Sequence, residues 1–205
     1  MSAHAASCDG VSSLRRQLKR ETATVHQRLE AQLGLLEPQL SLHRYRKVLE
    51  TFYGFYAPVE ISLARLAAVV TPIGFPLRAR AGLIESDLVA LGLSPRELAE
   101  LPWCSDLPPL SCAEHLAGCL YVFEGACLGG QVVARALQRQ LGVAKGSGAS
   151  FFVGDADGTA ARWRLVLTWL EGLERVGAPN EPIVASALAT FSTLARWFEQ
   201  QDAAQ

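Results

Sequence analysis

Apolar residues recur at three- and four-residue spacing along most of this chain, which is the pattern of amphipathic helices. The spacing predicts a first helix from about Leu14 to Leu35. A second helix is expected to begin after Ser41, a residue type that caps helix N-termini, and to end before Pro72 and Pro76. Its buried face would be one apolar stripe, formed by Tyr45, Val48, Leu49, Phe52, Tyr56, Val59, Leu63 and Leu66. A stripe this wide is typical of a core helix.

The middle of the chain continues the helical pattern with one interruption. A third helix is expected from about Leu77 to Leu91, where Gly92 ends it, and the segment from there to Pro109 is expected to be an irregular connection. Ser111, followed three residues later by Glu114, predicts a capping box at the start of a long fourth helix.

The long helix is expected to reach about Leu141, where a glycine-rich loop follows. Two further helices are expected from about Thr159 to Val176 and from about Glu181 to Gln200. Strand patterns are scarce throughout the chain, so the sequence predicts an all-α fold.

Length and composition narrow the class of protein further. The 205 residues are expected to form a single helical domain over 14–200, with a disordered lead at 1–13 and a flexible tail at 201–205. The 19 Lys and Arg residues balance 20 Asp and Glu residues, which gives no general attraction to nucleic acid or to an anionic membrane. No apolar run approaches the length of a membrane span, and the N-terminus lacks the apolar core of a secretory signal. We therefore expect a cytoplasmic protein that binds neither.

Glycines interrupt the long helix in the stretch YVFEGACLGGQV, at Gly125, Gly129 and Gly130. Each interior glycine costs roughly 0.5–1 kcal/mol relative to alanine, so the set gives up about 2 kcal/mol of helix stability. Close packing of two helices would explain this cost, and so would the close approach of a ligand to the backbone. The stretch by itself leaves both explanations open.

The first helix carries a histidine that could bind a metal. His26 lies beside the apolar residues Val25 and Leu29, and Glu30 follows one turn later, where its carboxylate can support a metal-bound imidazole. Lys19 precedes His26 by two turns, which is about 10 Å along the helix axis and close to the reach from a haem iron to its propionates. A hydrogen-bonded core histidine and a solvated lysine are the alternative interpretations.

Three segments taken together resemble the haem oxygenase family. They are RETATVHQRLE in the first helix, YRKVLETFYGFYAPVE in the second and YVFEGACLGGQV in the fourth. The likeness is closest to the bacterial enzymes associated with bacteriophytochromes, extends from about Leu14 to Phe198, and includes RARAGLIESDLVALG and SFFVGDADGTAARWR. The resemblance implies a single-domain helical bundle in which haem lies between a proximal helix and a kinked distal helix.

The resemblance also implies roles for residues on the proximal side and at the haem edge. His26 matches the iron ligand and Glu30 the carboxylate that supports it. Lys19 matches a partner of the haem propionates. Arg162 or Arg164 falls near a second such position, and the alignment there shifts by a residue or two.

On the distal side, Gly125, Gly129 and Gly130 are expected to leave room for the macrocycle and bound dioxygen, where a Cβ atom would collide. Tyr56 matches a tyrosine near the distal water network, and Phe191 is expected among the haem-binding residues.

One position departs from the pattern of the animal enzymes. Ala126 stands where those enzymes have an aspartate that holds distal water, although some bacterial relatives also lack this carboxylate. We expect backbone carbonyls and Tyr56 to hold the water instead. Ala126 is still expected to contact haem, and the neighbouring Cys127 is expected to be buried as a small apolar residue.

The function that this resemblance implies is oxidative cleavage of haem at a meso carbon, with biliverdin, carbon monoxide and ferrous iron as products. Haem would be both cofactor and substrate, with dioxygen and a ferredoxin or flavin reductase as electron donor. A bacteriophytochrome could receive the bilin. A non-catalytic haem carrier or sensor is the principal alternative, since Ala126 removes an acid. A helical interaction module without haem and a thiamin-degrading enzyme are further alternatives, and the last needs pocket cysteine and carboxylates that we cannot place.

Overall fold

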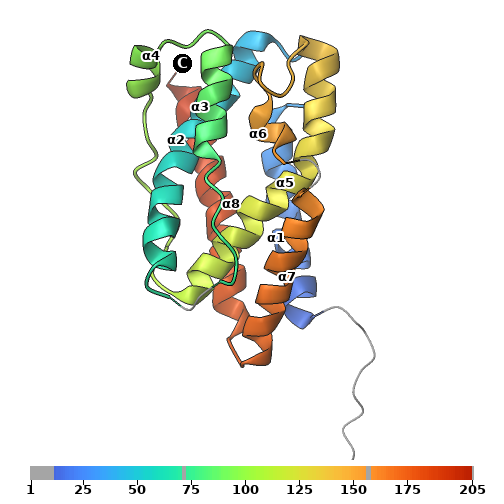
Figure 1. Ribbon diagram of the computed structural model, residues 1–205, viewed down its shortest axis with the longest axis vertical. Helices are drawn as coiled ribbons and strands as arrows, with labels where there is room; N and C mark the ends of the chain where they lie inside the picture. The colour runs from blue at the N-terminus through green and yellow to red at the C-terminus, as the bar shows by residue number, and fades with distance from the viewer. Residues whose placement is uncertain (1–11, 71–72, 156–157, 205) are drawn as a thin grey trace, which may run out of the picture.

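The computed structural model describes residues 12–70, 73–155 and 158–204, and all regular secondary structure within these residues is helical (Figure 1). The helices are α1 (Ser13–Leu33), α2 (Leu42–Ala67), α3 (Ala81–Ala90), α4 (Pro95–Ala99), α5 (Ala113–Leu141), α6 (Ser150–Val153), α7 (Thr159–Arg175) and α8 (Asn180–Ala203). The predicted all-α fold is confirmed. The predicted disordered lead lies almost entirely outside the described residues, and α8 continues into the segment predicted as a tail.

Helix ends follow local capping chemistry where a polar side chain is available. The Ser12 side chain accepts a hydrogen bond from the Arg15 backbone N–H at the start of α1, and Gly34 ends the helix with a φ of 62°, a left-handed conformation that favours glycine. Ser41 caps α2 as predicted, accepting from the Arg44 backbone N–H. The second helix ends at Ala67, whereas its predicted boundary at Pro72 lies outside the described residues.

Several details of the sequence prediction differ from the structure. Helix α3 begins at Ala81 rather than at Leu77, because the backbone N–H groups of Arg80 and Ala81 donate to the Glu60 carboxylate of α2. The predicted irregular connection contains α4, which has a complete capping box formed by Ser94 and Glu97. The short helix α6 was not predicted.

The capping box predicted at the start of α5 is wrong. Cys112 is the N-cap residue, without a side-chain hydrogen bond. Ser111 instead contacts the Nδ1 atom of His115 through its hydroxyl oxygen, at 3.1 Å. The pattern of a serine and a glutamate three residues apart was present, but the N-cap lies one residue beyond the serine and the helix begins at Ala113.

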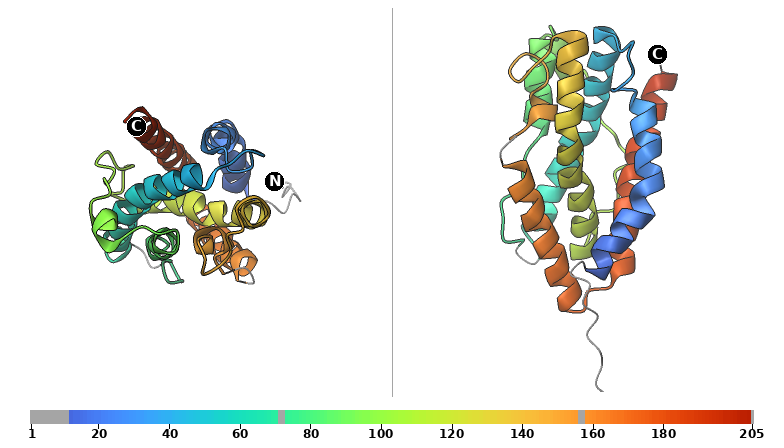
Figure 2. Two further views of the ribbon diagram at one scale, coloured as in Figure 1. Left: turned by 90° about the horizontal axis from the view of Figure 1, so that it is seen from above. Right: turned by 90° about the vertical axis from the view of Figure 1, so that its right-hand side faces the viewer.

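Helix α8 supports both α1 and α5. Figure 2 shows α1 lying along α8 on one side of the molecule, with α5 beside them and α7 on the opposite side. The crossing of α5 and α8 is close at Gly118, where an added Cβ atom would lie 2.4 Å from the Ile183 carbonyl oxygen. Glycine is required there because a larger residue would force the two helices apart.

Helix α5 changes direction near its middle, as Figure 1 shows. This is the kinked helix that the sequence resemblance implies, and paired glycines are a common cause of such bends. By length and hydropathy, α5 could cross a membrane, but 56% of its most apolar window is buried inside the protein. That burial is typical of the core helix of a globular domain.

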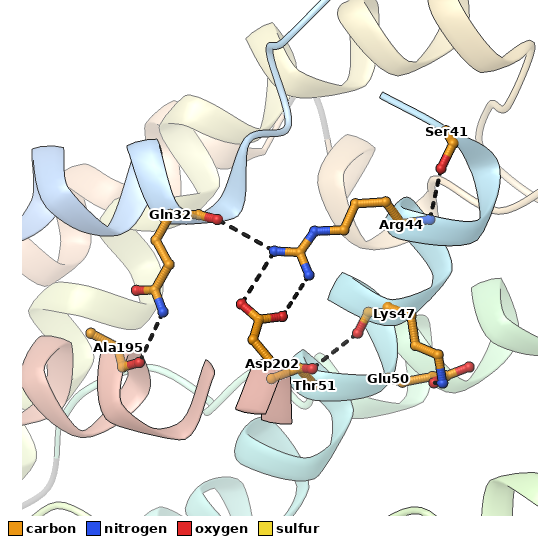
Figure 3. A network of polar contacts seen from close by, with 8 residues as sticks. All are labelled: Gln32, Ser41, Arg44, Lys47, Glu50, Thr51, Ala195 and Asp202. Carbon is orange, nitrogen blue, oxygen red and sulfur yellow. Dashed lines mark hydrogen bonds and ion pairs between the residues drawn. The ribbon is translucent and has the colours of Figure 1, made fainter. Parts of the chain in front are cut away.

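A polar network fixes the C-terminal end of α1 to α2 and α8 (Figure 3). The Arg44 guanidinium donates to Asp202 at 2.6 Å and to the Gln32 carbonyl oxygen at 3.4 Å. The Gln32 side chain donates in turn to the Ala195 carbonyl oxygen at 3.2 Å. Three helices are thereby joined at one end of the bundle, just beyond the turn of α1 that carries Glu30.

Candidate functional site

A cleft between α1 and α5 is the principal candidate site. It consists of two adjoining cavities, which we name by a residue unique to each: the Lys19 cavity, of about 370 Å³, and the Tyr56 cavity, of about 420 Å³. Both cavities are lined by His26, Glu30, Val122, Gly125, Ala126, Leu128 and Phe191. Their remaining walls are largely apolar, so the cleft suits a large hydrophobic ligand with a few polar groups.

The α1 wall presents His26 to the cleft. Its side chain is 47% exposed, which excludes the interpretation of a buried core histidine. The Nδ1 atom lies 3.6 Å from the Glu30 carboxylate, and the ring meets Phe191 edge-on at a centroid distance of 5.5 Å. The one-turn spacing therefore does bring Glu30 beside the imidazole, as predicted, and Phe191 supports the ring from α8.

Lys19 lines its cavity near one end of the cleft, with Thr22 and Trp163 among its neighbours. Thr22 is buried and its hydroxyl donates to the Leu18 carbonyl oxygen at 2.7 Å, so it contributes little free hydrogen-bonding capacity. Among the described residues that line this cavity, Lys19 and His26 are the two with basic side chains.

The glycines of the α5 wall have different surroundings. A Cβ atom added to Gly129 would have no neighbour within 4 Å, and one added to Gly125 would make ordinary contact with Trp163 at 3.5 Å. One added to Gly130 would lie 2.5 Å from the Phe152 carbonyl oxygen of α6. Close packing, one of the two explanations that the sequence left open, therefore applies to Gly130. Gly129 adds no side chain to the cleft, and the approach of a ligand there stays a prediction.

Tyr56 forms part of the inner wall of its cavity. The side chain is only 3% exposed, and its ring lies against Phe123 at a centroid distance of 4.4 Å. Burial raises the pKa of the Tyr56 hydroxyl above its usual range, which keeps the proton on the oxygen. This residue can therefore act as a hydrogen-bond donor to a ligand or water in the cleft.

Arg80 also lines the Tyr56 cavity, and the sequence analysis did not identify it. Its buried guanidinium donates to the Cys127 thiol at 2.8 Å and to the Phe151 carbonyl oxygen, and it stacks over the Phe151 ring at 4.3 Å. In the described part of the chain no ion pair joins this guanidinium to a carboxylate. A buried cation without a paired carboxylate favours negative charge or oriented water nearby.

The arginines predicted at the haem edge lie outside both cavities. Arg162 is buried and donates two hydrogen bonds to the Glu124 carboxylate, at 2.9 and 2.7 Å, while its guanidinium lies over the Phe75 ring. Its charge is already paired, so we do not retain it as a propionate partner. Arg164 is exposed, donates to the Ala160 carbonyl oxygen and flanks Trp163, the residue of this segment that does line the cleft.

Ala126 lines both cavities and brings no acid to this part of the α5 wall. Cys127 is buried, as predicted, and burial raises the pKa of its thiol. The thiol is not solely apolar in its contacts, because it accepts the Arg80 hydrogen bond. No sequence pattern indicated the meeting of Arg80 with Cys127, since the two residues are 47 positions apart.

A histidine on one wall, an open glycine on the other and a lysine in the adjoining cavity line a largely apolar slot. The fold and the site define an all-α protein with a cleft for a large, mainly apolar ligand. Residues 12–200 match the family model described as "Heme oxygenase", and the chain belongs to this family of enzymes.

Individual relatives agree with this assignment. "Heme oxygenase" of Xanthomonas campestris pv. campestris (strain 8004) is 33% identical over 149 residues, which cover 72% of this chain and 84% of that protein. The fold is shared with heme oxygenase-1 of Synechocystis sp. PCC6803, solved in complex with heme, at a TM-score of 0.73, 21% identity and 94% coverage of each chain. The heme oxygenase of Leptospira interrogans has a TM-score of 0.72 and 22% identity, with coverage of 92% of this chain and 100% of that one.

Proposed function

We propose that this protein cleaves haem at a meso carbon and releases biliverdin, carbon monoxide and ferrous iron. Membership of the family supports haem degradation, and one structural observation supports its location. His26 and Gly129 line the same cavity from opposite helices, so the proposed iron ligand shares this cavity with a position that carries no side chain.

The residues of the cleft fit haem in defined roles. His26 would hold the iron, with Glu30 fixing the orientation of the imidazole. Lys19 would pair with a propionate, and exposed Arg164 is a second candidate for that contact. Bound haem would supply an iron that activates dioxygen, and its own ring would be the substrate.

The distal wall would then control where reaction occurs and how protons arrive. The backbone at Gly125 and Gly129 would allow the macrocycle to lie against α5, and the bound ring with the apolar lining would keep bulk water from the reacting carbon. Tyr56 would donate a hydrogen bond through its hydroxyl, and the Arg80 guanidinium would orient water at the inner wall. These groups would take the place of the aspartate that Ala126 lacks.

A haem carrier or sensor is the second candidate function, because Ala126 provides no acid at the distal wall. It would use His26 and Lys19 in the same way and would retain haem unchanged. We favour catalysis, because Tyr56 and Arg80 place two hydrogen-bond donors in the cavity wall.

The wider biological role is proposed on the sequence resemblance. Electrons would come from a ferredoxin or a flavin reductase in the cytoplasm, and the bilin would supply the chromophore of a bacteriophytochrome. Mixing the reaction product with an apo-phytochrome and recording its red absorbance would test that last step.

The decisive experiment adds hemin to the purified protein, records the Soret band, and then supplies ascorbate or a ferredoxin system under air. Chromatography should identify biliverdin, with release of carbon monoxide. A stable Soret band without bilin under these conditions would establish the carrier instead.

The mutation His26→Ala should abolish bilin formation because the axial imidazole is lost, with partial rescue by added imidazole. His43→Ala, at an exposed position of α2, is the matched control and should behave as wild type. Wild-type turnover by His26→Ala without imidazole would show that another residue holds the iron.

A further inference from the structure

A third cavity lies between α2, residues 77–80 and α5, and has a volume of about 200 Å³. We call it the rear chamber; its polar lining residues are Glu60, Arg78, Arg80 and Glu124. Arg80 and Phe123 line both this chamber and the Tyr56 cavity. The two spaces therefore share a wall in which Arg80 is the charged component.

Glu124 is the exceptional residue of the rear chamber. Its side chain is only 5% exposed, and Oε1 accepts both hydrogen bonds from Arg162. Among the residues that the structure describes, Oε2 is buried without a hydrogen-bonding partner. A buried carboxylate oxygen without a donor is costly. Glu124 lines the rear chamber, so a donor held there would remove this cost.

The chamber has the dimensions for that donor to be water. One water molecule occupies about 30 Å³ of liquid, so the chamber has room for several, and a site with more than one polar partner is one that holds water. Besides Glu124, the charged residues that line the chamber are Glu60, Arg78 and Arg80. Arg78 also pairs with Asp155 at 3.5 Å, and the Arg80 guanidinium also donates to Cys127.

Glu60 is the residue of the rear chamber that we expect to exchange protons. Its carboxylate accepts from the backbone N–H groups of Arg80, at 2.7 Å, and of Ala81, at 3.2 Å. Burial raises the pKa of Glu60, against the opposing effect of these hydrogen bonds and of the Arg80 charge. The charged and titratable groups facing it are Arg78, Arg80 and Glu124 across the chamber and Tyr56 on its own helix.

We propose that Glu124 is a positioning residue that holds ordered water in the rear chamber, and that this water supplies protons to the cleft past Arg80. The proposal rests on the proposed function. A proton would pass from the Glu60 carboxyl group to chamber water, and water oriented by Arg80 would pass a proton into the cleft. Glu60 would then regain a proton from bulk solvent, while Arg80 remains protonated throughout.

The first test is a high-resolution crystal structure of the haem-free protein. We expect an ordered water within hydrogen-bonding distance of Glu124 Oε2, with further waters reaching Glu60 or Arg80. A chamber without ordered water, or an Oε2 atom bonded only to a protein donor, would overturn the proposal. This measurement does not depend on catalysis, so it stands even if the wild-type protein forms no bilin.

The second test compares bilin formation in H₂O and D₂O. Glu124→Gln keeps the acceptor for Arg162 and removes the second carboxylate oxygen. We expect unchanged hemin affinity, turnover slower by about tenfold and an increased solvent isotope effect. The loss is smaller than the roughly 100-fold minimum for a group that itself transfers the proton, because Glu124 acts only by positioning water. Glu50→Gln is the matched control, because Glu50 is a largely buried, ion-paired carboxylate of α2 that lines none of the three cavities.

A third variant separates the proposed role from stability. The double substitution Glu124→Leu with Arg162→Leu replaces the buried ion pair by apolar side chains. Such a replacement is often neutral or stabilising for the fold. It should fold and bind hemin, yet show the same slow turnover and raised isotope effect. If either Glu124 variant kept the wild-type pH profile and isotope effect, the pair would have only a structural role and the proposal would fail.

Discussion

Replacing the adjacent glycines Gly129 and Gly130 by alanine separates the two demands on the bent helix α5. The residues are neighbours in one helix, but an added Cβ atom meets nothing within 4 Å at Gly129 and lies 2.5 Å from the Phe152 carbonyl oxygen at Gly130. Neither residue has a positive φ, so alanine is compatible with the backbone at both positions.

The magnitudes follow from these surroundings. Alanine in a helix interior is more stable than glycine by roughly 0.5–1 kcal/mol, and Gly129→Ala should realise that gain in the haem-free protein. Gly130→Ala adds an overpacking cost of about 1–3 kcal/mol, because a backbone carbonyl cannot rotate away as a side chain can, and the net loss should be roughly 1–2 kcal/mol. For a domain of this size 1 kcal/mol corresponds to about 2–4 °C in melting temperature.

Thermal unfolding of the haem-free variants measures this difference. Gly129→Ala should raise the melting temperature by about 1–4 °C, and Gly130→Ala should lower it by roughly 2–8 °C. With haem bound, Gly129 should become the sensitive position. Gly129→Ala, and more strongly Gly129→Leu, should weaken oxygen binding or change the biliverdin isomer. A destabilised Gly129→Ala apoprotein with normal oxygen affinity and product would refute the placement of Gly129 on the open wall.

Substitutions at two further positions test the lysine of the site and the attachment of α6 to α3. Lys19→Ala should alter the mixture of biliverdin isomers more than it weakens hemin binding, because an exposed ion pair contributes about 0–1 kcal/mol; an unchanged isomer ratio and affinity would remove Lys19 from the site. Asp87→Ala should destabilise the protein by roughly 1–3 kcal/mol, because the buried Asp87 carboxylate accepts the Ser150 and Phe151 backbone N–H groups, each at 2.7 Å. Asp87→Asn retains one acceptor and should lose less in the same melting experiment, and equal losses would contradict this reasoning.

The sequence predicted those features that depend on residues close together in the chain. Helical periodicity located the long helices, and the one-turn spacing brought Glu30 beside His26. The error at Ser111 shows the limit of local patterns, because a serine and a glutamate with the required spacing do not determine which neighbouring residue begins the helix.

The features that were missed depend on tertiary contacts. Arg80 reaches Cys127 across 47 positions, and Arg162 reaches Glu124 across 38. Helical periodicity cannot indicate either pairing, because it shows which residues of one helix share a face and not which distant residues they contact. The different constraints on Gly129 and Gly130 likewise arise from α6, a helix too short to give a periodic pattern.

The close crossing at Gly118 has a consequence for how such a protein could be redesigned. Because α8 supports both walls of the cleft, the separation of those walls is set by a helix that contributes little to the lining. The Ser186 Cβ atom and the Ala187 backbone nitrogen lie 2.6 and 2.7 Å from a Cβ atom built at Gly118, so this crossing cannot tighten further. An enlarged residue on the α8 side of the crossing would instead move α5 outward. Directed evolution toward bulkier macrocycles could therefore begin at α8, leaving His26 and the glycine wall untouched.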